Sequence, residues 1–165
     1  MQVDAKFLLE HLQYSQWASE RSIEAVRPLT IEEQNRYLYT SYHGVLETLV
    51  HIYKADRVWL SRLDGSPRLT LADLGETFTL DTLALAWATT HAGFESWAGA
   101  LTDDAVTGIL KYVNLQGNSY ELPVWQVILH VVNHASYHRG QITTMLRQLN
   151  HKPIGTDLAA YYNSR

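Results

Sequence analysis

The chain of 165 residues is 46% hydrophobic and carries a formal net charge of −4, which predicts a folded globular protein with one domain over residues 1–165. The absence of Lys/Arg runs argues against nucleic acid as a partner. No apolar run approaches the ~20 residues of a membrane-spanning helix, and the first residues do not resemble a secretory signal. With no cysteine, the chain forms neither disulfides nor thiolate metal sites. We therefore expect a cytoplasmic protein without a membrane partner.

Hydrophobic periodicity predicts long helices through most of the chain. The first covers about residues 4–26 and ends before the proline of "RPLT". The second begins with Ser41 as N-cap and continues to about Leu63, where "DGSP" interrupts the pattern. The third covers about residues 81–101, with Asp81 as its cap.

The segment after the third helix predicts a short β-hairpin, because "ILKYVNL" and "SYEL" flank a Gly-Asn turn. A fourth helix begins near Pro123 and continues to about Leu149, and a brief helix is expected around residues 157–163. The sequence therefore predicts an all-α fold, an antiparallel four-helix bundle with a small β-hairpin before the last long helix. The connection between the second and third long helices is the longest and could carry a crossover.

Three histidines recur at intervals of four in the fourth helix, in "ILHVVNHASYHRGQ". At about 100° per residue, His130, His134 and His138 fall within the apolar stripe, whereas Arg139 falls on the opposite side. A buried imidazole must satisfy two nitrogens, and burial disfavours its charged form. Hydrogen-bonded core histidines are one interpretation of this pattern. The other is a divalent cation that satisfies several imidazoles at once.

A further ligand could come from His51 in the second helix. On helical geometry this residue is surrounded by small or uncharged side chains, namely Gly44, Thr48, Ala55 and Val58. Taken singly, the other histidines are better explained as structural or surface residues: His11, His43, His91 and His151. The motif from His134 to His138 lacks the glutamate of the HExxH metalloproteases, so that class of enzyme is excluded.

The chain resembles the DinB/YfiT-like superfamily of small bacterial metal-binding four-helix bundles. The resemblance lies mainly in "HVVNHASYHRGQI", residues 130–142, and "LVHIYKADRVWL", residues 49–60. Weaker similarity lies in "YSQWASER" and "YVNLQGNSYELPVWQ". The resemblance implies that His51, His134 and His138 are the metal ligands. It implies that His130 does not bind the metal itself and either supports the ligands or lines the pocket.

Some members of that superfamily are transferases that use low-molecular-weight thiols such as mycothiol and bacillithiol, and members are often homodimers. Three imidazoles leave a divalent ion with open coordination positions, as catalysis requires. We therefore expect a metal-dependent enzyme for a small-molecule substrate, either a transferase using an external thiol or a hydrolase. A non-catalytic metal-binding stress-response bundle is the alternative, and a metal-free interaction module is a third interpretation. Nitrogen ligands suit zinc or nickel, and iron or copper are also possible metals for such a site.

Overall fold

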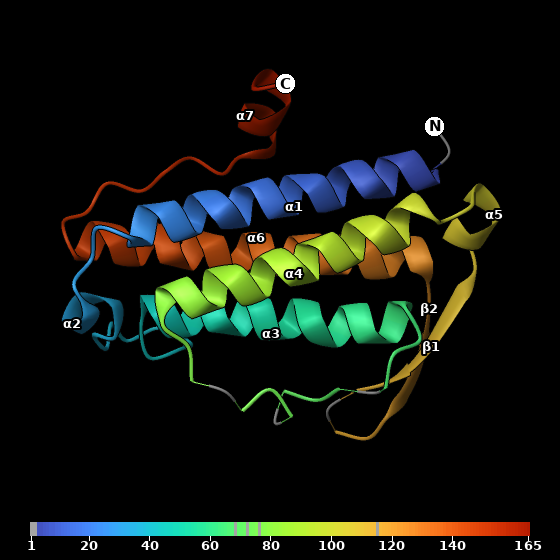
Figure 1. The fold of residues 1–165 in the computed structure, drawn as a ribbon, viewed down its shortest axis with the longest axis horizontal. Helices are drawn as coiled ribbons and strands as arrows, with labels where there is room; N and C mark the ends of the chain where they lie inside the picture. The colour runs from blue at the N-terminus through green and yellow to red at the C-terminus, as the bar shows by residue number, and fades with distance from the viewer. Residues whose placement is uncertain (1–2, 68, 72, 76, 115) are drawn as a thin grey trace.

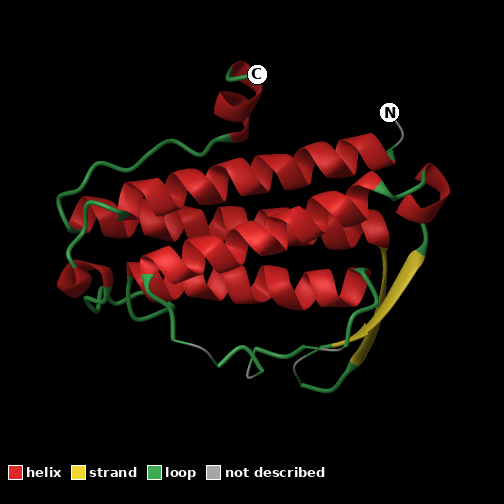
Figure 2. Ribbon diagram, in the orientation of Figure 1, coloured by secondary structure: helices red, strands yellow, loops and turns green. Residues whose placement is uncertain are grey.

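A computed structural model describes residues 3–67, 69–71, 73–75, 77–114 and 116–165. Over these residues it contains seven helices and a two-stranded antiparallel sheet (Figure 2). Four long helices lie side by side as a bundle, which confirms the predicted fold class (Figure 1). They are α1 (Ala5–Val26), α3 (Val45–Leu63), α4 (Leu80–Gly99) and α6 (Val124–Gln148).

The long helices run in two opposite directions. Helices α1 and α6 share one direction, and α3 and α4 share the other (Figure 1). Both α1 and α3 pack against α4 and α6. The chain leaves α3 at one end of the bundle and enters α4 at the other, so the described residues between Asp64 and Thr79 return along its side (Figure 1). This return is the crossover that the length of the connection suggested.

Local hydrogen bonds determine where two of the long helices begin. Thr79 and Thr82 cap α4 reciprocally, so that helix begins at Leu80 and Asp81 is not its cap. Helix α3 begins at Val45 after Gly44, and the prediction of Ser41 as its N-cap is wrong. A Cβ on Gly44 would lie 2.8 Å from the carbonyl oxygen of Arg36. Glycine therefore lets the preceding loop close tightly onto the start of α3.

The predicted hairpin is confirmed as β1 (Ile109–Val113) and β2 (Ser119–Pro123), paired antiparallel. It lies at the end of the bundle where α3 ends and α6 begins (Figure 2). The terminal helix is confirmed as α7 (Leu158–Asn163). The sequence did not predict α2 (Ile31–Gln34) and α5 (Asp103–Val106), because four residues are too few for a periodic pattern.

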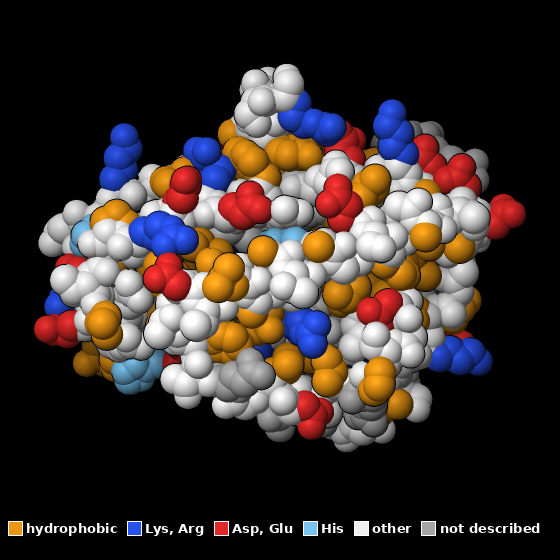
Figure 3. Space-filling model, viewed as in Figure 1, with side chains coloured by type: hydrophobic (Ala, Val, Ile, Leu, Met, Phe, Trp, Pro, Cys, Tyr) orange, Lys and Arg blue, Asp and Glu red, His pale blue; other side chains and the backbone are white. Residues whose placement is uncertain are grey.

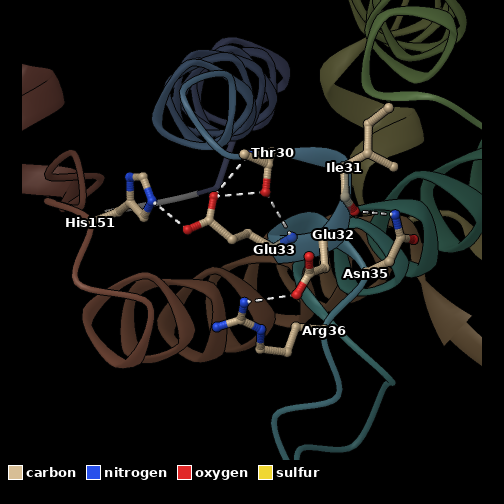
Figure 4. A network of polar contacts seen from close by, with 7 residues as sticks. All are labelled: Thr30, Ile31, Glu32, Glu33, Asn35, Arg36 and His151. Carbon is tan, nitrogen blue, oxygen red and sulfur yellow. Dashed lines mark hydrogen bonds and ion pairs between the residues drawn. The ribbon is translucent and has the colours of Figure 1, made fainter.

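The start of α2 accounts for one of the isolated histidines. Thr30 and Glu33 form a capping box, in which the Glu33 carboxylate accepts from the Thr30 backbone N–H at 2.8 Å (Figure 4). The other carboxylate oxygen of Glu33 lies 3.3 Å from His151 Nε2 (Figure 4). The backbone N–H of Thr30 and then the His151 ring lower the pKa of Glu33. His151 thus joins the segment after α6 to α2, as the structural interpretation predicted.

The middle of the bundle contains polar groups as well as apolar ones. Trp87 Nε1 donates to Asp56 Oδ2 at 2.9 Å, and both side chains are buried. Burial raises the pKa of Asp56 to about 7, against the hydrogen bond from Trp87 and the positive charge of Arg139. His91 is also buried there and stacks on Trp87, so it is not a surface residue.

Arg139 belongs to the same polar cluster. Its side chain is only 2% exposed, although the helical pattern had set it apart from the histidine face. One terminal nitrogen lies 3.4 Å from the hydroxyls of both Ser15 and Ser19 on α1. The other donates to Ser136 Oγ at 2.9 Å. Arg139 therefore binds α6 to α1 across the interior.

The molecular surface is mixed in character. Figure 3 shows Lys and Arg side chains, Asp and Glu side chains and apolar groups interspersed over the face in view. Across the described ranges, no helix combines the length and the apolar character needed to cross a membrane.

We predict that Trp87→Phe lowers the free energy of unfolding by about 2–4 kcal/mol, because it leaves a buried Asp56 oxygen without its donor and opens a small cavity. Urea unfolding followed by circular dichroism measures the change. Trp97→Phe on the same helix is the control, since Trp97 is only partly buried. A loss for Trp87→Phe no larger than that of the control would contradict the prediction.

Candidate metal centre

Three histidines from two helices meet at one place in the bundle. His51 comes from α3, and His134 and His138 lie one turn apart on α6. One ring nitrogen of each histidine lies within 4.8 Å of those of the other two, and His51 Nε2 is 3.1 Å from His134 Nε2. Among the described residues this is the one group of three or more His, Cys, Asp or Glu side chains close enough to share an ion. The structure thus brings together the three residues that the sequence singled out.

The spacing of these nitrogens fits a divalent ion. With Zn–N bonds of 2.0–2.1 Å, two ligands of a tetrahedral zinc lie about 3.3 Å apart. The 3.1 Å between His51 and His134 is close to that value. Two imidazole nitrogens at this distance form a hydrogen bond only if one of them carries the proton, whereas an ion accepts both lone pairs. The donor set therefore suits a metal at least as well as a metal-free hydrogen bond.

Burial keeps two of the rings neutral. Burial, and then the charge that His138 would carry, lower the pKa of His51 to about 4. Burial and the neighbouring histidines, first His138 and then His51 and His130, lower the pKa of His134 to about 3. Near neutral pH both rings are uncharged, so their lone pairs are available to a cation.

Gln141 determines the orientation of the third ring. Its side-chain oxygen lies 2.8 Å from His138 Nδ1 and accepts a hydrogen bond from it. This bond places the proton of His138 on Nδ1 and leaves Nε2 as the acceptor. Gln141 in turn donates to Ser41 Oγ at 3.4 Å. The loop before α3 and helix α6 therefore hold the His138 ring jointly.

Tyr42, in the loop before α3, covers the cluster and was not expected from the sequence. Its ring stacks on His51 with centroids 4.1 Å apart and meets His138 edge-on at 5.5 Å. The Tyr42 hydroxyl lies 2.9 Å from His51 Nε2. Burial, and then the charge of Glu47, raise the pKa of Tyr42, so the hydroxyl keeps its proton at neutral pH.

A cavity of about 340 Å³ leads to the cluster. It lies between α3, α6 and the hairpin, and His51 and His134 form part of its wall. Aromatic side chains from the helix and the hairpin form further walls, among them Trp59, Tyr112 and Tyr120. A small molecule can therefore approach two of the three imidazoles from this side.

His130 lines the same cavity and stays outside the cluster. Its ring meets Trp59 edge-on at 5.1 Å and lies 6.0 Å from the ring of His134. The side chain is exposed, so the expectation that all three histidines of α6 face the core is wrong for His130. Partial loss of hydration at the cavity wall, and then the positive charge of Arg62, lower its pKa. This position agrees with the expectation that His130 is a residue of the pocket.

Together these features define a helical-bundle protein with a three-histidine cluster beside an open cavity. The sequence model of the DinB family matches residues 1–165. The chain belongs to the DinB family, as its resemblance to that group had indicated.

Known proteins of this family resemble the chain over almost its whole length. Protein DinB of Bacillus subtilis (strain 168) is 26% identical over 165 residues, with coverage of 94% of this chain and 93% of that protein. The crystal structure of a DinB-like protein from Bacillus cereus ATCC 10987 has a TM-score of 0.72 at 21% identity, covering 94% of this chain and 99% of the other. The DinB-like protein YjoA from Bacillus subtilis has a TM-score of 0.63 at 12% identity, covering 88% and 95%. At these identities the two crystal structures show the shared fold.

We predict that acid destabilises the metal-free protein partly through His134. Its pKa is about 3 when folded, against an ordinary 6.5, so between these values the unfolded chain binds more protons. The stability that depends on a neutral His134 is present above about pH 6.5 and is lost as the pH falls. Urea unfolding in EDTA at pH 7 and pH 5 should show a smaller difference for His134→Gln than for the unsubstituted protein. Equal differences would contradict the prediction.

Proposed function

We propose that the protein binds one divalent metal ion through His51, His134 and His138 and uses it in catalysis on a small molecule. The observation that carries this proposal is the convergence of three imidazoles beside an open cavity. A ligand set made only of nitrogen suits zinc or nickel best, and iron or copper can also occupy such a site.

The cavity favours catalysis over a purely structural ion. Structural zinc sites usually close with four protein ligands, whereas catalytic sites use three and keep a position open for substrate. Here two of the three proposed ligands, His51 and His134, line a cavity large enough for a small molecule. These features support an enzyme over the alternative of a non-catalytic stress-response bundle.

Thiol transfer is the reaction we propose first. A bound divalent ion would lower the pKa of a thiol or of water and so supply a nucleophile near neutral pH. In the transfer, the sulfur forms a bond to an electrophilic carbon, the leaving group departs with the electron pair, and the thiol proton passes to solvent. Because the chain has no cysteine, the thiol must come from a low-molecular-weight cosubstrate. Hydrolysis of a small molecule is the second candidate.

Residues around the cluster would position the reactants. Gln141 holds the His138 ring with Nε2 free of the proton. The Tyr42 hydroxyl lies 2.9 Å from His51 Nε2, so it would lie beside an ion bound there. The rings of Trp59 and Tyr112 shield the approach from bulk water.

We predict that replacing His51, His134 or His138 with Ala removes most bound zinc, because each supplies one of three ligands. His130→Ala should lose much less, since that ring lies outside the cluster. Elemental analysis after incubation with one equivalent of zinc and desalting measures the difference. Full zinc occupancy in His134→Ala would overturn the assignment of ligands.

Two further variants calibrate this measurement. Gln141→Ala removes only the partner of a ligand and should weaken zinc binding by roughly 10–100-fold. His43→Ala should leave zinc unchanged, because His43 is exposed and outside the cluster. Circular dichroism with and without EDTA should show that every variant keeps its helices, since apolar burial holds the bundle together.

For the thiol reaction, we predict that thiols at millimolar concentration add a near-ultraviolet charge-transfer band to the cobalt-substituted protein. Sulfur ligation produces such a band, and oxygen or nitrogen ligation does not. An unchanged spectrum with several thiols would remove thiol transfer and leave hydrolysis or a structural ion. The His134→Ala variant is the control, because it should bind little cobalt and show no band.

A further inference from the structure

The end of the cavity away from the histidine cluster carries a positive charge. Arg62 lines the same cavity as His51 and lies about three helical turns further along α3. At a rise of 1.5 Å per residue this separation is ~16 Å along the helix, and the lean of helical side chains leaves roughly 10–15 Å between the two groups. One small molecule of extended shape can therefore reach both ends.

The guanidinium of Arg62 has a defined place in the cavity wall. It lies 4.4 Å from the ring centroid of Trp59 on α3 and 5.0 Å from that of Tyr112 on β1. It also donates to the backbone oxygen of Val113 at 3.1 Å. Two aromatic rings and a backbone carbonyl thus orient this charge, so its position is set before any ligand binds.

The surroundings of Arg62 favour an anion. The cavity wall contains the guanidinium of Arg62 together with the side-chain amides of Asn114 and Gln116, and both kinds of group carry N–H donors. The positive charge of Arg62 also contributes to the lowered pKa of His130 across the cavity. With a divalent cation at the histidines, both ends of the cavity would be positive. A ligand with a negative group at each end matches this field.

The middle of the cavity is apolar. Between His51 and Arg62 along α3, the wall contains Ala55, Val58 and Trp59, and Leu71 adds further carbon surface to the cavity. An apolar or flat segment of a ligand is accommodated there with little loss of hydration. The cavity thus has a metal-ligating end, an apolar middle and a cationic end.

We propose that the cavity selects elongated anionic substrates, with the reacting group at the histidine cluster and a carboxylate bound at Arg62. This inference rests on the proposed function, and for thiol transfer it specifies a carboxylate-bearing thiol. A planar guanidinium matches a carboxylate through paired hydrogen bonds, whereas a neutral end group gains no such contact. Arg62 is therefore a specificity-determining residue that recognises the substrate at a distance from the reacting atom.

The first test compares thiols that differ only at the far end. In 8-mercaptooctanoate, sulfur and carboxylate lie roughly 10 Å apart when the chain is extended with C–C bonds of ~1.5 Å. Calorimetric titration of the zinc-loaded protein should show this acid binding about tenfold more tightly than 8-mercaptooctanol, the gain of about one charge-assisted contact. The short acid 3-mercaptopropionate should gain nothing over its alcohol, because it cannot span the cavity. Equal affinities for the two long thiols would overturn the inference and leave the metal site intact.

Substitutions show whether Arg62 causes the preference. Arg62→Gln should reduce the ratio of acid to alcohol affinity to about one, and Arg62→Lys should retain part of it by charge alone. Arg21→Gln is the matched control, because Arg21 also stacks on a tryptophan, Trp17, and also donates to a backbone oxygen, that of Gly155. The Arg21→Gln control should keep the tighter binding of the acid. If Arg62→Gln protein with normal helical content also binds the acid more tightly than the alcohol, the role of Arg62 is overturned.

A second measurement separates the inference from the proposed function. Octanoate and octanol lack the sulfur, so they test the Arg62 end in protein treated with EDTA. Octanoate should bind measurably more tightly than octanol, and Arg62→Gln should abolish that difference. Equal binding of both compounds would refute the anionic subsite. Absence of zinc binding in the unsubstituted protein would instead refute the proposed function, whatever octanoate does.

Discussion

The register between α3 and α6 is the constraint on which the candidate site depends. It places His51 opposite His134 and His138, and one end of the same interface sets Trp59 against His130. A slip of one turn would move a helix by ~5.4 Å, more than the 4.8 Å within which the three ligand atoms lie. Apolar side chains of both helices share one core cluster on the inner side of the histidines, among them Leu49, Ile52, Ile142 and Met145. Burial of that cluster therefore holds the three histidines close to one another.

The polar cluster at the centre of the bundle restricts the helices further. Arg139 and Asp56 are both almost completely buried, and each forms a hydrogen bond with a residue on a neighbouring helix. A different helix offset would leave a buried charge without its partners, at a cost of several kcal/mol. Arg139 directly follows His138, so adjacent positions of α6 serve the core and the histidine cluster. The packing that places the arginine against α1 also directs the histidine toward His51.

The sequence predicted the elements that repeat over several turns and missed those that depend on a single contact. Periodicity located all four long helices, whereas the start of α3 depends on the tight approach at Gly44. Histidine spacing and family resemblance singled out the three histidines that form the cluster. Helical spacing could also have identified Gln141, because a residue three positions after His138 lies on the same side of the helix. Tyr42 lies in a loop, where no spacing rule applies, so only the folded structure shows it over the cluster.

His130 and Arg62 show why a helical pattern alone cannot describe the cavity. Both belong to helices that the sequence predicted, yet their surroundings are set by the hairpin packed across the end of the bundle. In the absence of Tyr112 and Tyr120, the end of α3 beyond Trp59 would face solvent and form no enclosed space. The helices thus hold the three imidazoles and the charge of Arg62, and the hairpin supplies part of the cavity wall. Because these are separate elements, substitutions in the hairpin can reshape the cavity without moving the three imidazoles.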